Sequence, residues 1–203
     1  MVVLLSSLAQ VEPGMDQRNV AFEAEYEVRV TDITEGGVRR ESRELFRLYR
    51  DARGRSRLEG ATVDKGRVVL RYALLTDLRR HRALLLDLAT GKPVDPCHAP
   101  AGGAPPAAGL PLVGRPSAVE VGDASEEGSK VNDLGETQIE GLEARGLRVS
   151  TPSSTTEVWT ARQIDQPPLL VRTMGPTRES TARLFNVRLI EPDPRLFSAL
   201  DDR

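Results

Sequence analysis

Between residues 21 and 31, apolar and polar side chains alternate strictly along the chain. Successive side chains of an extended strand point to opposite faces, so this period of two predicts a β-strand with one buried face and one solvated face. The alternation does not fit a helix, whose faces repeat every 3.6 residues. The buried face would carry Phe22, Ala24, Tyr26, Val28 and Val30, and the solvated face Glu23, Glu25, Glu27, Arg29 and Thr31.

Similar patterns recur along the chain, separated by short turns rich in glycine and aspartate. Strands at such close and even spacing predict an antiparallel sheet and argue against β-α-β units. The last segment has apolar residues on both faces, which is typical of a strand inside a sheet. A tail at residues 191–197 is fixed by two prolines and should fold Leu196 and Phe197 back onto the sheet. We expect strands at residues 21–31, 38–49, 55–63, 67–76, 82–88, 136–139, 142–150, 155–162, 169–174 and 179–190.

Residues 93–116 interrupt this pattern, with seven of the fourteen prolines and four glycines. Proline cannot donate a hydrogen bond to a strand ladder, so this segment is expected to be a loop. A weak helical pattern follows at residues 116–127, so the fold would include at most one or two short helices. At 203 residues the chain has the length of one domain, which we place at residues 10–203.

The first ten residues are apolar and then small, with Ser7 and Ala9 placed before Gln10 as before a signal-peptidase cut. This is the pattern of the end of a secretory signal peptide without its basic n-region. We therefore expect residues 1–9 to be a signal-peptide remnant and the protein to be periplasmic or secreted, if the true start lies upstream of Met1. A frayed N-terminus or a first strand would explain the same residues. No apolar run approaches the ~20 residues that cross a bilayer, so we expect no membrane-spanning segment.

The motifs of familiar enzyme classes are missing from the sequence. It has no Gly-x-Ser-x-Gly elbow, no Gly-x-Gly-x-x-Gly after a strand and no His-x-x-His pair, so we expect no catalytic residues, no metal site and no cofactor. The net charge of −2 gives no general attraction to nucleic acid. Eight arginines lie between Arg39 and Arg57, but acidic residues interleave with them. This favours a solvated face with cross-strand ion pairs over a nucleic-acid interface.

Two further groups of side chains allow two interpretations each. Glu23, Glu25 and Glu27 share one strand face at steps of about 7 Å and could hold a cation. Without oxygen ligands from elsewhere, a solvated face is the better interpretation. Trp159 is the only tryptophan and would either line a ligand pocket or pack in the core. Core packing is the simpler interpretation, because aromatic residues are scarce here and each contributes a large buried area.

Seven short segments, taken together and in order, resemble the sequences of a group of uncharacterised secreted proteins from acidobacteria and related soil bacteria. They are LYRDARGRSR at 48–57, DLATGK at 87–92, LG at 134–135, IEGLEARG at 139–146, EVW at 157–159, NV at 186–187 and EPDPRLF at 191–197. The layout is also similar to that of outer-membrane lipoprotein carriers and of sigma-factor regulatory proteins with the same fold. The resemblance spans most of residues 20–198. It departs from the group at residues 151–154, where a longer insert is usual, and in the missing n-region.

The resemblance implies export and a strongly curved antiparallel sheet, an open half-barrel whose concave side holds an acyl chain or a partner's peptide. It supplies no catalytic residues. We therefore predict a mainly β fold, and a non-enzymatic extracytoplasmic protein that binds a hydrophobic ligand or a lipidated partner in the concave face of its sheet. If helices or the loop at 93–116 fill that space, the same residues form an ordinary core. The ligand-binding candidates taken from the alternation are Phe22, Tyr26, Val28, Phe46, Leu48, Tyr72 and Trp159.

Two other functions are compatible with the sequence. The chain could be an envelope protein-interaction module that uses its sheet edges for strand addition and has no small-molecule ligand. An enzyme would require Asp, Glu and Arg side chains that converge in a pocket with perturbed ionisation. We rank the enzyme last.

Overall fold

The computed structural model describes residues 20–64, 67–94, 128–164 and 167–201. Three predicted features lie outside these ranges: the signal-peptide remnant at 1–9, residues 95–116 of the loop, and the weak helical pattern at 116–127. The described strands are β1 (Phe22–Ile33), β2 (Arg39–Arg50), β3 (Arg55–Asp64), β4 (Arg67–Asp77), β5 (Arg82–Asp87), β6 (Lys130–Ile139), β7 (Leu142–Ser150), β8 (Thr155–Ala161), β9 (Leu170–Met174) and β10 (Arg178–Arg188).

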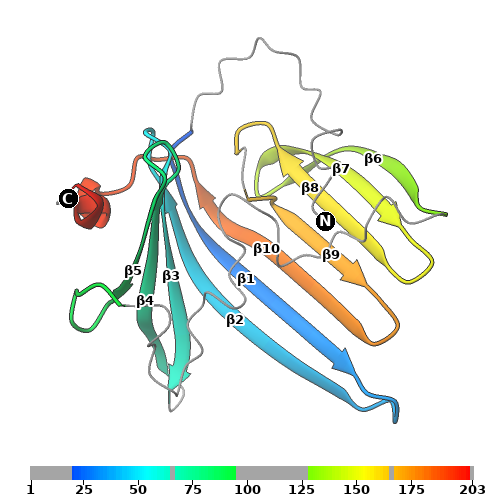
Figure 1. Cartoon of the computed structure of the whole chain (residues 1–203). Coiled ribbons are helices and arrows are strands. Elements are labelled where there is room, and N and C mark those ends of the chain that lie inside the picture. The colour runs from blue at the N-terminus through cyan, green and yellow to red at the C-terminus, as the bar shows by residue number, and fades with distance from the viewer. Residues whose placement is uncertain (1–19, 65–66, 95–127, 165–166, 202–203) are drawn as a thin grey trace.

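These strands form one antiparallel sheet in the order β5-β4-β3-β2-β1-β10-β9-β8-β7-β6. Two five-stranded meanders, β1 to β5 and β6 to β10, are joined where the first strand pairs with the last. The sheet curves strongly and does not close, because β5 and β6 stand at opposite ends of the order (Figure 1). The predicted single curved sheet, open as a half-barrel, is confirmed, and β10 lies inside it as its apolar faces indicated.

The predicted strand bounds agree with the structure to within two residues, except at β6. That strand begins at Lys130, six residues before the expected start at Glu136. Asn132, Asp133 and Gly135 are poor strand formers, so local preference hides the strand. Pairing with β7 overrides this preference, and a bulge between Asp133 and Gly135 absorbs the irregularity.

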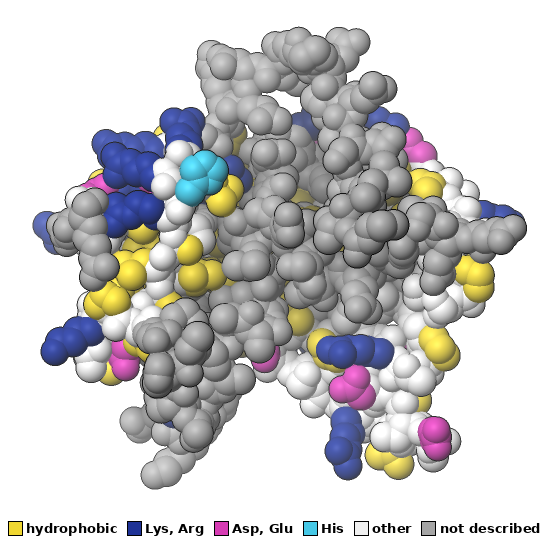
Figure 2. Space-filling view, in the orientation of Figure 1, with side chains coloured by type: hydrophobic (Ala, Val, Ile, Leu, Met, Phe, Trp, Pro, Cys, Tyr) yellow, Lys and Arg dark blue, Asp and Glu magenta, His cyan; other side chains and the backbone are white. Residues whose placement is uncertain are grey.

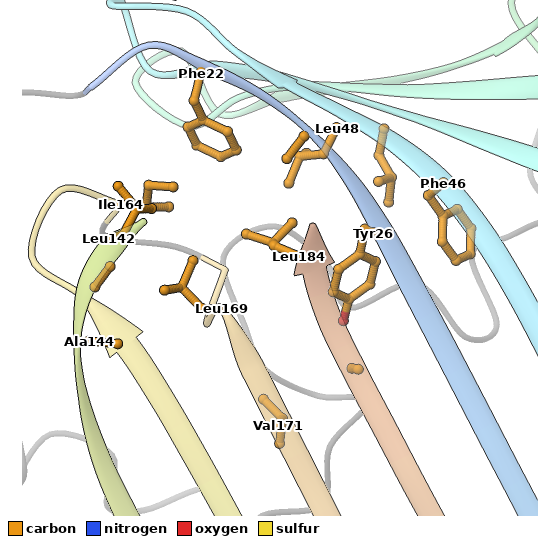
Figure 3. Packing of buried hydrophobic residues seen from close by; sticks show 14 residues of the cluster. Phe22, Tyr26, Phe46, Leu48, Leu142, Ala144, Ile164, Leu169, Val171 and Leu184 are labelled. Atoms are coloured by element: carbon orange, nitrogen blue, oxygen red, sulfur yellow. The ribbon is translucent and has the colours of Figure 1, made fainter. Parts of the chain in front are cut away.

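We call the face of the sheet that carries Tyr26 the inner face, and the face that carries Glu27 the outer face. The largest apolar cluster is built mainly on the inner face of the central strands, and the sheet curves around it (Figures 1 and 3). A smaller cluster of Ala73, Leu75 and Leu86 lies on the outer face of β4 and β5. Strands β4 and β5 are therefore covered on both faces, and the central strands chiefly on one.

The short 3₁₀ helix η3 (Pro194–Leu200) covers this smaller cluster, on the outer side of the sheet in Figure 1. Of the two residues predicted to fold back onto the sheet, Phe197 is fully buried and Leu196 is partly buried. Leu200 is also fully buried and belongs to the smaller cluster. The Arg55 guanidinium lies 4.9 Å from the centre of the Phe197 ring, and Arg57 donates to the Leu196 carbonyl oxygen at 2.9 Å. Burial disfavours the charge of Arg55, but hydrogen bonds to Asp51 and Asp201 outweigh it and raise the pKa of Arg55.

Candidate functional site

The inner face of the central strands is a continuous apolar surface. In the strand register, Tyr26 of β1 stands opposite Phe46 of β2 on one side and Leu184 of β10 on the other. Directly paired residues point to the same face, so these three side chains form one row across the sheet. The Tyr26 and Phe46 ring centres are 6.0 Å apart and tilted by 42°. Figure 3 shows the apolar surface continuing along β1 and β2 to Leu48 and Phe22.

Six of the seven residues predicted from the alternation share this inner face. Phe22, Tyr26, Phe46 and Leu48 are buried members of the main cluster, and Val28 packs against it as a partly buried neighbour. Tyr72 reaches the same face through its pairing with Gly60, which pairs in turn with Phe46. It is buried but is not part of the main cluster.

Trp159 is placed differently from the other six. Its partner in β9 is Leu170, which pairs with Arg183 of β10, and Arg183 pairs with Glu27. This ladder puts Trp159 on the outer face, while Val158 stands on the face of Val28. The indole covers Gly146, where an added Cβ would lie 2.6 Å from a ring carbon. The ring also packs against the main cluster as a partly buried neighbour, as core packing predicted.

The inner face changes from apolar to polar along β1. Beyond Val28, the row at Val30 has Ser42 and Ser180 as neighbours. The next row places Asp32 between Arg40 and Arg178, all three exposed. An elongated molecule with one apolar and one polar end would match this gradient.

Tyr26 places a phenol hydroxyl inside the apolar part of the face. Burial raises the pKa of Tyr26 to about 12, so its phenol stays neutral at physiological pH. A neutral hydroxyl in apolar surroundings can orient one polar atom of a ligand, and it is no base at neutral pH. The arrangement is suited to binding.

The outer face of the same strands holds a buried charge that the sequence interpretation did not anticipate. Glu27 was expected in water with Glu23 and Glu25, but it is only 3% exposed. Arg43 from β2 and Arg183 from β10 donate to its two oxygens, and Arg29 lies 3.4 Å from one of them. Burial opposes ionisation of Glu27, but the hydrogen bonds from the two arginines outweigh it and lower the pKa of Glu27. Glu23 and Glu25 have the same flanking strands but are only partly buried, so the arginines gathered on Glu27 set this carboxylate apart.

Cross-strand ion pairs were predicted for the arginine-rich segment, and the structure contains them. Arg39 binds Glu179 at 2.6 Å, and Arg29 binds Glu41 at 3.3 Å. Within residues 20–64, 67–94, 128–164 and 167–201, no group of three His, Cys, Asp or Glu side chains is arranged to hold a metal ion. Over the same ranges, no helix is long and apolar enough to cross a membrane.

Several residues of the apolar cluster were not selected from the sequence. Leu184, Leu169 and Ile164 are almost fully buried. In Figure 3, Ile164 lies beside Leu142 and Leu184 lies towards Tyr26. Leu184 was recognisable as part of an apolar strand, but its contact with Tyr26 depends on the pairing of the first strand with the last. Ile164 follows β8 in a connection without strand periodicity, so no pattern marked it.

No model of a known protein family matches the sequence, and no curated protein matches it. Among solved structures, the fold is similar to a LolA superfamily protein from Nitrosomonas europaea, at 8% identity and a TM-score of 0.40, over 88% of this chain and 90% of that one. It is also similar to MucB, solved in complex with MucA(peri), at 13% identity and a TM-score of 0.47. That match covers 88% of this chain and 54% of MucB. Lipoprotein LppX of Mycobacterium tuberculosis matches at 8% identity and a TM-score of 0.35, over 80% and 84% of the chains.

Identities this low concern the fold alone. The function is therefore argued from the side chains of this protein.

Proposed function

We propose that this protein is a non-enzymatic extracytoplasmic protein that binds a hydrophobic ligand, or the acyl chain of a lipidated partner, on the inner face of its sheet. One observation carries the proposal. The apolar side chains of β3, β2, β1, β10 and β9 form a single surface on the side towards which the sheet curves, and the one described helix packs on the opposite face.

The partly buried margin of this surface is where a ligand would first make contact. Val28, Leu74 and Val158 pack against the main cluster but remain partly accessible. Each buried methylene of an acyl chain contributes about 0.8 kcal/mol, so a few such contacts give useful affinity. The polar end of the inner face at Asp32 and Arg40 would leave a ligand's head group in water.

Native mass spectrometry of the whole chain, purified from a lipid-containing host, tests the proposal. We expect an adduct with the mass of an acyl-chain molecule that organic extraction removes. A clean apo mass, together with no uptake of a dansyl-labelled fatty acid, would contradict the proposal.

A matched pair of variants locates the ligand. Val28→Glu places a charge at the margin of the apolar surface and should abolish the adduct. Val38→Glu makes the same change at a 59% exposed position outside it and should preserve the adduct. Circular dichroism confirms that both variants fold, and an adduct that survives in both would place the ligand elsewhere.

A second candidate function, partner capture by strand addition, is favoured by the difference between the two ends of the sheet. Next to β5, the chain returns at Pro93 and Val94 and bonds to Leu85 and Leu86. At the other end, β6 is ten residues long with nearly all its side chains exposed. An exposed edge strand is a template for pairing with another chain.

Photo-crosslinking separates this second candidate from the first. A benzoylphenylalanine at Val131 of β6 should crosslink a partner in cells that naturally make the protein. The same residue at Leu78, which is similarly exposed in a turn, should not. Equal crosslinking at both positions would exclude β6 as a specific docking edge.

A further inference from the structure

A cleft of about 530 Å³ opens on the outer face where β1, β2 and β10 meet. Glu23 and Glu25 contribute to its lining from β1, Arg47 and Tyr49 from β2, and Arg188 from β10. It lies across the sheet from the apolar surface, because these side chains alternate with those of the inner face.

A bulge in β10 creates this cleft. Glu25 pairs with Phe185 and Glu23 pairs with Arg188, so Asn186 and Val187 both stand opposite the single residue between the two glutamates. Asn186 adopts a positive φ of 53°, which asparagine tolerates better than most residues. Its backbone N–H donates to a carboxylate oxygen of Glu140 at 3.0 Å. The turn between β6 and β7 therefore holds the bulge from the far end of the sheet.

The charges in the cleft are only partly matched to one another. Arg188 forms an ion pair with Glu23, and Arg47 is hydrogen-bonded to Tyr49. Glu25 stands directly opposite Arg47, yet among the described residues no ion pair or hydrogen bond joins the two. One step along β1, Glu27 contacts three arginines. Glu25 can thus accept from an external cation, and Arg47 has donors left for an external anion.

We propose that this cleft binds an extended peptide segment of a partner protein, which offers a basic side chain to Glu25 and an acidic side chain to Arg47. In an extended peptide, side chains two positions apart share a face about 7 Å apart. The Cβ atoms of directly opposed residues such as Glu25 and Arg47 are about 5 Å apart, so one such pair of side chains can reach both. The charge pattern of the cleft is complementary to this peptide.

Size and surroundings also favour a peptide over a single amino acid. The cleft volume lies within the range of about 300–1,000 Å³ found for ligand sites that hold drug-sized molecules. Leu189 and Ile190 follow Arg188 directly, and both are 46% exposed. They would offer apolar contact to residues that flank the charged pair.

Titration of the isotope-labelled full chain with a blocked pentapeptide, Val-Lys-Val-Glu-Val, tests the proposal by NMR. The neutral peptide Val-Gln-Val-Gln-Val is the control. We expect saturable shifts of the amide signals of Glu25, Arg47 and Asn186 with the charged peptide and none with the neutral one. Equal binding of the two peptides, or no shifts at these residues, would overturn the proposal.

Two variants test whether the charges of Glu25 and Arg47 bind the peptide. Glu25→Gln and Arg47→Gln should each weaken binding roughly tenfold or more, because each removes a charge-assisted contact. Arg39→Gln, at the far end of the same face, should leave the affinity unchanged. An affinity that does not respond to either cleft variant would exclude the site. Free lysine or glutamate binding as tightly as the peptide would assign the cleft to a small zwitterion instead.

Discussion

Both faces of β1 bury side chains, but the inner face buries apolar groups and the outer face buries a charge. On the inner face, Tyr26 packs between Phe46 and Leu184 without any charge nearby in its row. On the outer face, the next residue, Glu27, is equally buried and is held by arginines from both neighbouring strands. A central strand buries alternate residues against the core, but its other residues are also enclosed by the side chains of the strands beside it. The alternation in the sequence therefore tells apolar side chains of one face from polar side chains of the other. Whether a polar side chain is exposed depends on the position of its strand in the sheet.

The comparison predicts that the inner face contributes most of the stability. Burying a large apolar side chain is worth about 1.5–3 kcal/mol. Exposed ion pairs are each worth about 0–1 kcal/mol, and the arginines around Glu27 are themselves half exposed. The outer face should matter chiefly at Glu27.

The largest effect is expected from Leu184→Ala, which removes a side chain that is 1% exposed in the centre of the inner face. The cavity should lower the free energy of unfolding by about 2–5 kcal/mol, measured by urea denaturation. Leu189→Ala makes the same change at an exposed position of the same segment and should cost less than about 0.5 kcal/mol. Similar losses in the two variants would mean that the inner face does not dominate.

A smaller effect is expected from Glu27→Gln, which keeps the shape of the side chain and removes its charge. We expect a loss of about 1–2 kcal/mol at pH 7, because two charge-assisted hydrogen bonds become neutral ones. Glu41→Gln removes a 57% exposed carboxylate that pairs with Arg29 and should change stability by less than about 0.5 kcal/mol. Equal losses of stability in the two variants would show that the ion pairs of buried Glu27 are no stronger than the exposed pair of Glu41.

The contribution of Glu27 should also depend on pH. Its pKa is lower in the folded protein than in the unfolded chain, so its charge stabilises the fold fully above the unfolded value. This stability is lost as the pH falls from the unfolded pKa through the folded one. The difference in unfolding free energy between wild type and Glu27→Gln should therefore shrink on acidification from pH 7. A difference that stays constant down to pH 2 would contradict the lowered pKa.

An effect of similar size to that of Glu27→Gln is expected at Gly146 and Trp159, on the outer face of β7 and β8. Gly146→Ala adds a Cβ 2.6 Å from the Trp159 ring, which must move, at a cost of about 1–2 kcal/mol. In the background of Trp159→Ala, the same substitution should be nearly neutral. A thermal-denaturation cycle of the four proteins measures this coupling. Additive losses would mean that the ring does not confine Gly146.

The sequence predicted the fold better than the contacts between distant strands. Alternation and turn residues were enough to place nearly every strand, because both signals are local. Pairing of β1 with β10 is not local, and it decides that Glu27 is buried and that Tyr26 meets Leu184. The prediction put Trp159 on the inner face. Alternation within one strand does not tell which of its two faces matches the inner face of another strand, and only the pairing of the strands decides this.

The outer cleft was beyond sequence reasoning for a related reason. In residues 184–187, apolar side chains lie on both faces, which indicated only an internal strand. Leu184 faces inward and Phe185 outward beside Arg183, as alternation requires. The bulge at Asn186 shifts the phase after them, so Arg188, three residues beyond Phe185, also faces outward opposite Glu23. Its support comes from Glu140, which is distant in the sequence and carries no motif.

The ladder between the first strand and the last has a consequence for how this protein is made. Glu27 and Arg183 are 156 residues apart, so at about 5–20 residues per second β10 is synthesised roughly 8–30 s after β1. During that interval β1 would be an unpaired edge of the nascent meander of β1 to β5, and Glu27 would lack its ion pair with Arg183. This sheet can be completed only after β10 has been translated, and chaperone protection of the β1 edge would be most valuable until then.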